Sequence, residues 1–253
     1  MREKRLHAME SYIFEQRHTT LMQLCRHFNI SINTVRRDVE MLLSWGAVKK
    51  VYGGVVVNPQ YRSYLHHGER SAKNTDEKIR IGRKAAEFLK SNDIILIDSG
   101  STTSEFIRVI DTSLPLTVIT NSMSAIDIFS QSPAVKLISL GGEYLSYANG
   151  FASMETLYAL KRYKADKVFL SISGLELSPD GITNPSAFDS EVKKAMISCA
   201  REVYLLVDSS KFGVITPIVI AAYDQIDYLI TDAEPSLAYI RLLKEHNVEL
   251  VIA

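Results

Sequence analysis

Cysteine is scarce in this chain, because only Cys25 and Cys199 occur among its 253 residues. Two distant cysteines exclude a disulfide framework and leave no zinc-ligand spacing. No apolar run approaches the roughly 20 residues that a membrane-spanning helix needs, and the first residues, Met-Arg-Glu-Lys-Arg, are too charged for a signal peptide. We therefore expect a cytoplasmic protein with reduced thiols and no membrane contact.

The chain also lacks a net charge, but its positive and negative residues are unevenly divided. Residues 1–83 hold 15 Lys and Arg against 8 Asp and Glu, whereas residues 84–253 hold 14 against 21. A basic module followed by an acidic one indicates a polyanionic partner for the first. Chance drift of surface charge would give the same imbalance, so the charge alone does not decide.

Within the basic segment, residues 3–57 have the pattern of three helices followed by a hairpin of two short strands. Thr20 and Ser31 stand where N-caps of the second and third helices belong. Once the apolar face of the third helix is buried, the side chains left on its other faces are Asn33, Thr34, Arg36 and Arg37.

These side chains suit a DNA-binding helix-turn-helix, whose second helix meets base edges in the major groove. Arginine matches guanine, asparagine matches adenine, and threonine can contact a thymine methyl group or a phosphate. Lys49 and Lys50 on the hairpin would contact the phosphate backbone. The alternative is a three-helix bundle with a solvated arginine pair, but the caps, turn, hairpin and charge together favour double-stranded DNA as the partner.

Beyond residue 57 the pattern changes twice. Residues 58–77 are polar and weakly periodic, which predicts a linker. His66, His67 and Glu69 in this segment could hold a metal ion, but solvated side chains are the simpler interpretation. Residues 78–253 alternate short apolar strands with helices, which predicts one α/β domain with a mainly parallel sheet covered on both faces. We expect neither a metal nor a cofactor.

Small polar residues collect where the predicted strands end, the edge at which α/β sheets bind ligands. A helix beginning there offers backbone N–H groups to an anion, although ordinary N-capping by Ser101 or Thr102 would leave the same signature. The residues concerned are Asp98, Ser99, Gly100, Ser101, Thr102 and Thr103, then Thr120, Asn121 and Ser122, then Gly141 and Gly142, and finally Lys211. Together they predict a pocket for a small phosphorylated, polyhydroxylated molecule.

An enzyme that isomerises a sugar phosphate would need a carboxylate as its base. Carboxylates are available at Asp98, Asp180, Asp189 and Glu191, but none of them stands in a catalytic motif. Beside a DNA-binding module, binding without turnover is the simpler hypothesis. A sugar-phosphate isomerase with an appended DNA-binding module is the alternative.

Several segments of the chain together resemble the motifs of DeoR-family transcriptional repressors, nearly from end to end. Residues 35–39 (Val-Arg-Arg-Asp-Val) and 51–54 (Val-Tyr-Gly-Gly) are similar to the helix-turn-helix and wing signatures of that family. Residues 69–70 and 74–78 resemble its linker. The sensor-domain motifs are matched, in chain order, by residues 98–103, 117–122, 141–142 and 208–213.

This resemblance implies a winged helix-turn-helix in residues 1–57, a linker in 58–77, and a sensor domain in 78–253 related to ribose-phosphate isomerases and CoA transferases. It implies a regulator of a carbohydrate operon, a repressor more than an activator, with a phosphorylated sugar as effector and a homo-oligomer, dimer or tetramer, as its assembly. Residues 143–149 lack the basic residue that many relatives carry there. The residues implied around the sugar, beyond the phosphate loop 99–103, are Asn121, Gly142, Glu191 and Lys211.

Overall fold

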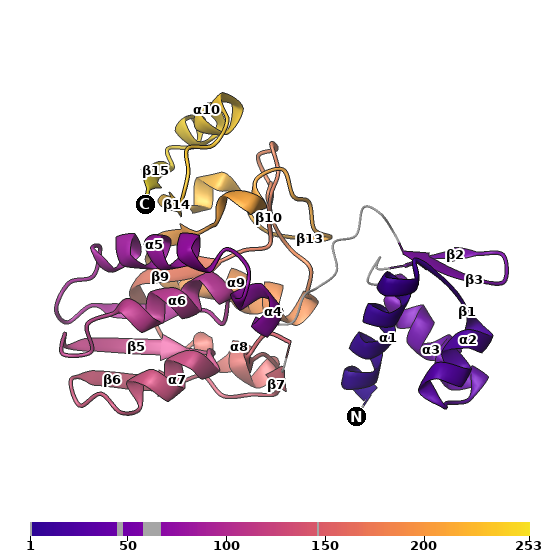
Figure 1. Cartoon of the computed structure of the whole chain (residues 1–253). Helices are drawn as coiled ribbons and strands as arrows, with labels where there is room; N and C mark the ends of the chain where they lie inside the picture. Colours follow the sequence, from indigo (N-terminus) through magenta and orange to yellow (C-terminus); the bar gives the residue numbers. More distant parts are fainter. Residues whose placement is uncertain (1, 45–47, 58–66, 146) are drawn as a thin grey trace. The chain divides into compact units, whose positions relative to one another are not determined.

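The computed structural model describes residues 2–44, 48–57, 67–145 and 147–253, and it divides into two compact units (Figure 1). The N-terminal unit is Met1–Tyr64 and the C-terminal unit is Leu65–Ala253. Each unit has its own buried core, so each is described by itself. None of the helices in the described ranges is long and apolar enough to cross a membrane.

The N-terminal unit combines three helices with a small antiparallel sheet in which β1 and β2 flank β3. Its elements are α1 (Arg2–Gln16), β1 (His18–Thr20), α2 (Leu21–Phe28), α3 (Ile32–Ser44), β2 (Val48–Val51) and β3 (Gly54–Val57). The helices and the β2–β3 hairpin confirm the predicted winged helix-turn-helix. The sequence does not predict β1, whose Thr19 pairs with Val55 of β3.

Local sequence explains where the helices of this unit begin and end. Thr20 and Gln23 form a capping box at the start of α2, in which each side chain accepts a hydrogen bond from the other residue's N–H. Asn29 ends that helix in the left-handed conformation, with φ 50°. At the start of α3, Ser31 Oγ accepts from the Thr34 N–H at 3.3 Å.

The C-terminal unit is built on a seven-stranded sheet with the order β15-β14-β12-β9-β4-β5-β6, in which every neighbouring pair is parallel. The strands are β4 (Ile94–Ile97), β5 (Leu116–Thr120), β6 (Val135–Ser139), β9 (Ala165–Ser171), β12 (Ala200–Leu206), β14 (Tyr228–Thr231) and β15 (Glu249–Ile252). The helices are α4 (His67–Ser71), α5 (Thr75–Ala86), α6 (Ser101–Val109), α7 (Met123–Phe129), α8 (Met154–Leu160), α9 (Ala187–Cys199) and α10 (Leu237–Glu245). This confirms the predicted α/β class.

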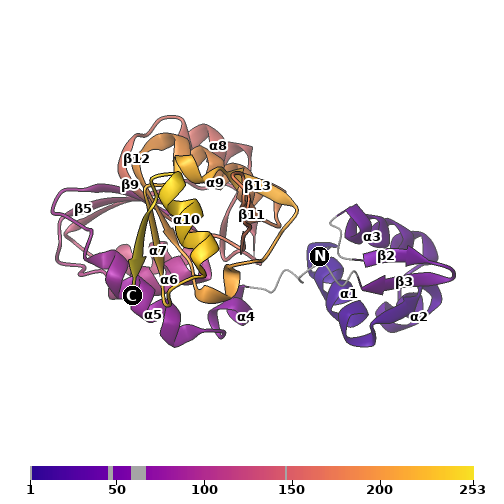
Figure 2. The same ribbon diagram turned by 90° about the horizontal axis from the view of Figure 1, so that it is seen from above.

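The strand order places a topological switch point between β4 and β9. From β4 the chain proceeds outward to β5 and β6, and then returns to add β9, β12, β14 and β15 on the other side. Helices α5 and α6 lie on one face of the sheet and α8 and α9 on the other (Figure 2). In open α/β sheets the crevice at such a point, beyond the carboxyl ends of the strands, is where ligands bind.

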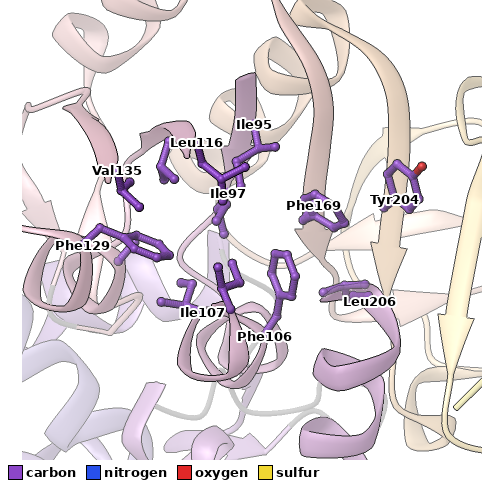
Figure 3. Close-up of a cluster of buried hydrophobic side chains, with 14 of the residues drawn as sticks. Ile95, Ile97, Phe106, Ile107, Leu116, Phe129, Val135, Phe169, Tyr204 and Leu206 are labelled. Carbon is purple, nitrogen blue, oxygen red and sulfur yellow. The ribbon is translucent and has the colours of Figure 1, made fainter. Parts of the chain in front are cut away.

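The core under α5 and α6 is rich in aromatic rings (Figure 3). Phe106 of α6 packs on Phe169 of β9, with ring centroids 4.5 Å apart, and Phe169 stacks on Tyr204 of β12 at 4.8 Å. Tyr204 stacks in turn on Tyr228 of β14 at 4.5 Å. Each ring buries a large apolar area, so this row fixes α6 and the strands that carry the site.

The structure of the C-terminal unit differs from the sequence-based expectation in three places. Residues 67–77, expected to belong to a linker, form α4 and the start of α5, because Lys78 and Asn74 tie this segment to the C-terminal unit. Residues 58–66 of the expected linker lie outside the described residues. The sequence also does not predict the short antiparallel sheet of β10 (Gly174–Leu175), β11 (Ile182–Asn184) and β13 (Ile218–Ala221), or the hairpin of β7 (Tyr144–Leu145) and β8 (Gly150–Phe151).

Candidate functional site

The candidate DNA-reading side chains lie on α3 and the β2–β3 hairpin. Asn33, Arg36 and Arg37 are exposed, as are Lys49 and Lys50. The Thr34 hydroxyl is already engaged, because it lies 2.9 Å from Ser31 Oγ within the N-cap.

Two features of this unit escape the sequence-based analysis. Tyr52, at the tip of the hairpin, is fully exposed and is therefore available to a partner. Asp38 is buried on α3 and accepts a hydrogen bond of 2.7 Å from Arg5 Nε, which ties α3 to α1 and holds the orientation of the recognition face.

In the C-terminal unit four polar residues lie where central strands of the sheet end, and one of them, Ser171, is not among the predicted residues. Asp98 follows β4, Ser171 ends β9, and Asn121 and Asp208 follow the outer neighbours β5 and β12. All four are buried. A buried polar group needs a partner or a ligand, so the bonds that each makes decide what the site can do.

Asp98 organises the loop that opens α6. Its Oδ1 accepts from the Gly100 N–H at 3.1 Å and from the Thr103 hydroxyl at 2.5 Å, while its Oδ2 accepts from the Ser171 N–H at 3.1 Å. Gly100 is required there, because a Cβ atom would lie 1.5 Å from Ser171 Oγ. The loop is therefore held in one conformation against the end of β9.

The N-terminus of α6 is the part of this loop that can hold an anion. Gly100 is its N-cap, and the helix start has no side-chain cap bond. The expected alternative, capping by Ser101 or Thr102, is therefore not what the structure shows. The first N–H groups of a helix without such a cap, together with the helix dipole, favour a negatively charged ligand.

The loop is also anchored by a buried lysine, Lys193, which the sequence did not predict for the site. Lys193 of α9 donates to Asp98 Oδ2 and to the Ser171 carbonyl, the latter at 3.0 Å, and its Nζ lies 3.7 Å from Asp189 Oδ2. Burial opposes the charge of Lys193, but Asp189 and Asp98 outweigh burial and raise its pKa. Asp189 also accepts from Asn184 Nδ2 at 2.8 Å. The result is a buried polar network beside the loop that opens α6.

Further positive charge comes from Lys78, the first residue of the expected sensor domain, and from Lys211. Lys78 of α5 is buried and donates to the carbonyls of Arg70 and Lys73, at 2.5 and 2.6 Å. Burial is the main cause that lowers the pKa of Lys78 to about 8; Lys211 and Arg70 add repulsion. Lys211 itself lies in η1 (Ser209–Lys211), with its Nζ 3.7 Å from Asp208 Oδ2.

Several of the residues predicted for the site lie outside the loop that opens α6. Asn121 Nδ2 donates to the Phe151 carbonyl at 2.9 Å. Its buried Oδ1 has no hydrogen-bond partner among the described residues, so it can accept one from a ligand. Thr120 and Ser122 are bonded to each other at the start of α7, with Ser122 N–H donating to Thr120 Oγ1 at 2.9 Å. Gly141 and Gly142 both have positive φ, 65° and 108°, in the turn after the edge strand β6.

Glu191 does not reach the loop. It is exposed on α9, and its Oε1 accepts from Lys194 Nζ at 2.9 Å. Lys193 and Asp189 stand two positions away on either side, which is about half a turn of helix, so they face Asp98 while Glu191 faces away. We therefore correct the expectation and remove Glu191 from the candidate site.

His67 gives the C-terminal unit a testable pH dependence. Burial, together with repulsion from Arg70, lowers the pKa of His67 to about 4 from 6.5. Between those values the unfolded chain binds more protons at this residue, so stability should fall as the pH drops from about 6.5 to about 4. Thermal unfolding of the full chain at several pH values should show this loss, and His67→Gln should reduce it. Parallel curves for the two proteins would contradict the assignment.

Comparison with known proteins identifies both units. Residues 5–61 match the family model of the DeoR-like helix-turn-helix domain, and residues 73–233 match that of the DeoR C terminal sensor domain. The chain is 34% identical to the HTH-type transcriptional regulator IolR of Bacillus subtilis over 253 residues, which covers 100% of both proteins. It is 28% identical to the glycerol-3-phosphate regulon repressor of Escherichia coli K12, over 93% of each.

Among solved structures, ribose 5-phosphate isomerase A from Methanocaldococcus jannaschii is similar over 55% of each chain, with 20% sequence identity and a TM-score of 0.40. The two family models cover most of the chain in the order in which the two units occur. An exposed recognition helix and wing in the first unit agree with the regulatory function of the relatives. The chain belongs to the DeoR family of helix-turn-helix transcriptional regulators.

Proposed function

We propose that this regulator represses an operon of carbohydrate catabolism, and that a phosphorylated sugar bound in the C-terminal unit changes its affinity for operator DNA. The main support for a phosphorylated effector is the N-terminus of α6, which has no side-chain cap and lies at the switch point of the sheet. Four cationic side chains lie within electrostatic range of one another in this unit, since Arg70 interacts with Lys78 and Lys193, and Lys78 interacts with Lys211. A phosphate dianion is the ligand that this arrangement suits best.

The rest of the effector is a polyhydroxylated carbon chain in this proposal. The buried Asn121 Oδ1 can accept a hydrogen bond from a sugar hydroxyl. The loop Ser99–Thr103 would hold the phosphate. The relative from Escherichia coli is named for a regulon of glycerol 3-phosphate, a phosphorylated polyol, which supports the same chemical class here.

Operator binding is proposed for the exposed side chains of the N-terminal unit. Arg36, Arg37 and Asn33 would read base edges in the major groove, with Thr34 beside them, while Lys49 and Lys50 contact phosphates. We further propose a homo-oligomer, because two copies of one recognition helix related by symmetry read two half-sites.

We propose binding without turnover. Asp98 already accepts three hydrogen bonds and pairs with Lys193, and Asp189 is bonded to Asn184 and lies beside the same lysine. Carboxylates that are engaged in this way do not offer a base poised between two carbons of a sugar. Isomerisation of any phosphosugar by the purified protein would contradict this proposal.

The test is a titration of the full chain onto labelled DNA from upstream of its own gene, at one fixed salt concentration, because phosphate contacts make every such affinity salt-dependent. Nonspecific competitor DNA is present, with and without a panel of pentose 5-phosphates and hexose 6-phosphates. We expect specific binding that one phosphosugar weakens. Specific binding that no member of the panel changes would contradict the effector. Reporter expression from the same promoter in a strain that lacks the gene tests repression, and lower expression there than in the wild type would contradict it.

Lys211→Ala should lose the response to the phosphosugar while keeping affinity for the operator. The substitution removes an ammonium group beside the proposed phosphate and leaves the N-terminal unit untouched. Lys161→Ala, which removes an exposed charge from the C-terminal unit, is the matched control and should respond as the wild type does. A normal response of Lys211→Ala in the same titration would exclude Lys211 from the effector site.

A further inference from the structure

Helix α4 is bonded to the loops that form the candidate effector site. His67 Nε2 lies 3.0 Å from Ser104 Oγ, which is in the first turn of α6 and itself donates to the Gly100 carbonyl at 2.8 Å. The His67 N–H donates to the Tyr147 carbonyl at 2.9 Å, and Arg70 Nη2 donates to the same carbonyl at 3.4 Å. Tyr147 is in the β7–β8 loop, so α4 joins that loop to the start of α6.

The other end of α4 is fixed from two further directions. Lys78 donates to the carbonyls of Arg70 and Lys73, where the helix ends. Asn74 Nδ2 donates to Asp208 Oδ1 at 2.9 Å, at the end of β12. A helix of five residues is not stable by itself, so the position of α4 depends on these contacts with the site.

The place of α4 in the chain is as informative as its contacts. It is the first described element of the C-terminal unit, and only residues 58–66 separate it from β3, the last strand of the N-terminal unit. Any movement of α4 therefore acts on the short segment that joins the effector-binding unit to the DNA-binding unit.

We propose that α4 reports occupancy of the effector site to the DNA-binding unit, and that His67 and Arg70 complete the site from this helix. The proposal rests on the proposed function, because it requires an anionic effector at the start of α6. It names two binding residues and a route of regulation for that site. The bond between His67 and Ser104 is its central contact.

Charge explains why an effector would change the position of α4. Arg70 lies close enough to His67, Lys78 and Lys193 to repel their charged forms, in addition to the burial that also disfavours those charges. A phosphate dianion at the N-terminus of α6 would relieve that repulsion and attract Arg70. A ligand shifts an equilibrium only through different contacts in its two states, and α4 supplies such a difference.

The experiment combines hydrogen exchange with operator binding, both on the full chain. Exchange of the backbone amides of residues 67–73 is measured by mass spectrometry with and without a pentose 5-phosphate, a hexose 6-phosphate and inorganic phosphate, and binding of each probe is measured by calorimetry. Operator affinity is compared for the wild type, His67→Gln and Ser104→Ala. Glu69→Gln is the matched control, because Glu69 is an exposed residue of the same helix.

We expect the phosphosugar that weakens operator binding to change exchange at residues 67–73 in the wild type. The ratio of operator affinities without and with that phosphosugar should fall from about tenfold or more in the wild type and Glu69→Gln to less than about twofold in His67→Gln and Ser104→Ala. Exchange in β4 and β9 shows whether each variant is folded. If a variant is not folded, the exchange of residues 67–73 in the wild type alone tests the role of α4.

Two other results would overturn the proposal in distinguishable ways. If a phosphosugar binds the wild type and weakens operator binding, but exchange at residues 67–73 is unchanged and both variants respond normally, α4 is not the reporter and the proposed function stands. If no probe binds the wild type, the proposed effector site fails, and the role of α4 fails with it.

Discussion

Replacing Lys193 with alanine should destabilise the C-terminal unit by about 3–5 kcal/mol, the usual cost of removing one partner from a buried ion pair. The Lys193 side chain is 3% exposed and that of Asp98 is 1% exposed. Without the ammonium group, Asp98 would stay buried with its hydrogen-bond donors but no counter-charge, and the Ser171 carbonyl would lose a donor. The loop before α6 would lose its anchor together with the stability.

Native-state hydrogen exchange of the β4 and β9 amides measures this loss in the full chain. Lys194→Ala is the matched control, because the neighbouring Lys194 forms an exposed pair with Glu191 and its loss should change stability by less than about 1 kcal/mol. A double-mutant cycle with Asp98→Asn should show that the two losses are not additive, as expected for groups in contact. Equal losses for Lys193→Ala and Lys194→Ala would contradict the role given to the buried pair.

Replacing Arg36 with alanine should weaken operator binding by about 1–3 kcal/mol, which is roughly 5- to 150-fold, and should relax the preference at one base pair. Arg36 is exposed on α3. The orientation of that helix is held by Asp38, which is buried on the same helix and paired with Arg5. The expected effect is a loss of base recognition in an intact unit.

Fluorescence anisotropy with operator DNA and with single-base variants measures both affinity and preference. Lys49→Ala is the informative comparison, because loss of a phosphate contact should weaken all sequences alike and reduce the slope of affinity against salt by about 1. Lys161→Ala, in the other unit, controls for a general loss of positive charge. Unchanged operator affinity in Arg36→Ala would remove this residue from the interface.

The fold could be predicted from sequence wherever a short-range pattern carries it. Thr20 and Ser31 indicate where the second and third helices of the N-terminal unit begin. The alternation of apolar strands and helices indicates the parallel sheet. The strand order could not be predicted in this way, because it depends on packing between distant segments. The small sheet is the clearest omission: β10 has two residues, and β11 pairs with β13 across more than 30 residues of chain.

The sequence predicted loop residues 99–103 and Lys211 for the candidate site, but it did not predict Lys193, Lys78 or His67 there. The glycine and hydroxyl residues at 99–103 are adjacent in sequence, so their pattern is visible. Lys193 is 95 residues from Asp98, and on α9 it resembles any surface lysine until the fold buries it. The burial of Lys78 and His67 near the site could not be predicted either, because polar residues near a domain boundary are typical of a solvated segment.

The tight packing of Gly100 against Ser171 also bears on how such a sensor could be redesigned. Because a Cβ atom at residue 100 would lie 1.5 Å from Ser171 Oγ and Asp98 is committed to its hydrogen bonds, the proposed phosphate loop tolerates little variation. Gly150 of the β7–β8 hairpin is constrained in the same way, because a Cβ atom there would lie 2.4 Å from Ser99 Cβ and 2.8 Å from the Asn121 carbonyl oxygen. An engineer who wants a biosensor for a different phosphorylated compound should therefore keep residues 98–104 and Gly150 intact and build the library in the surrounding loops.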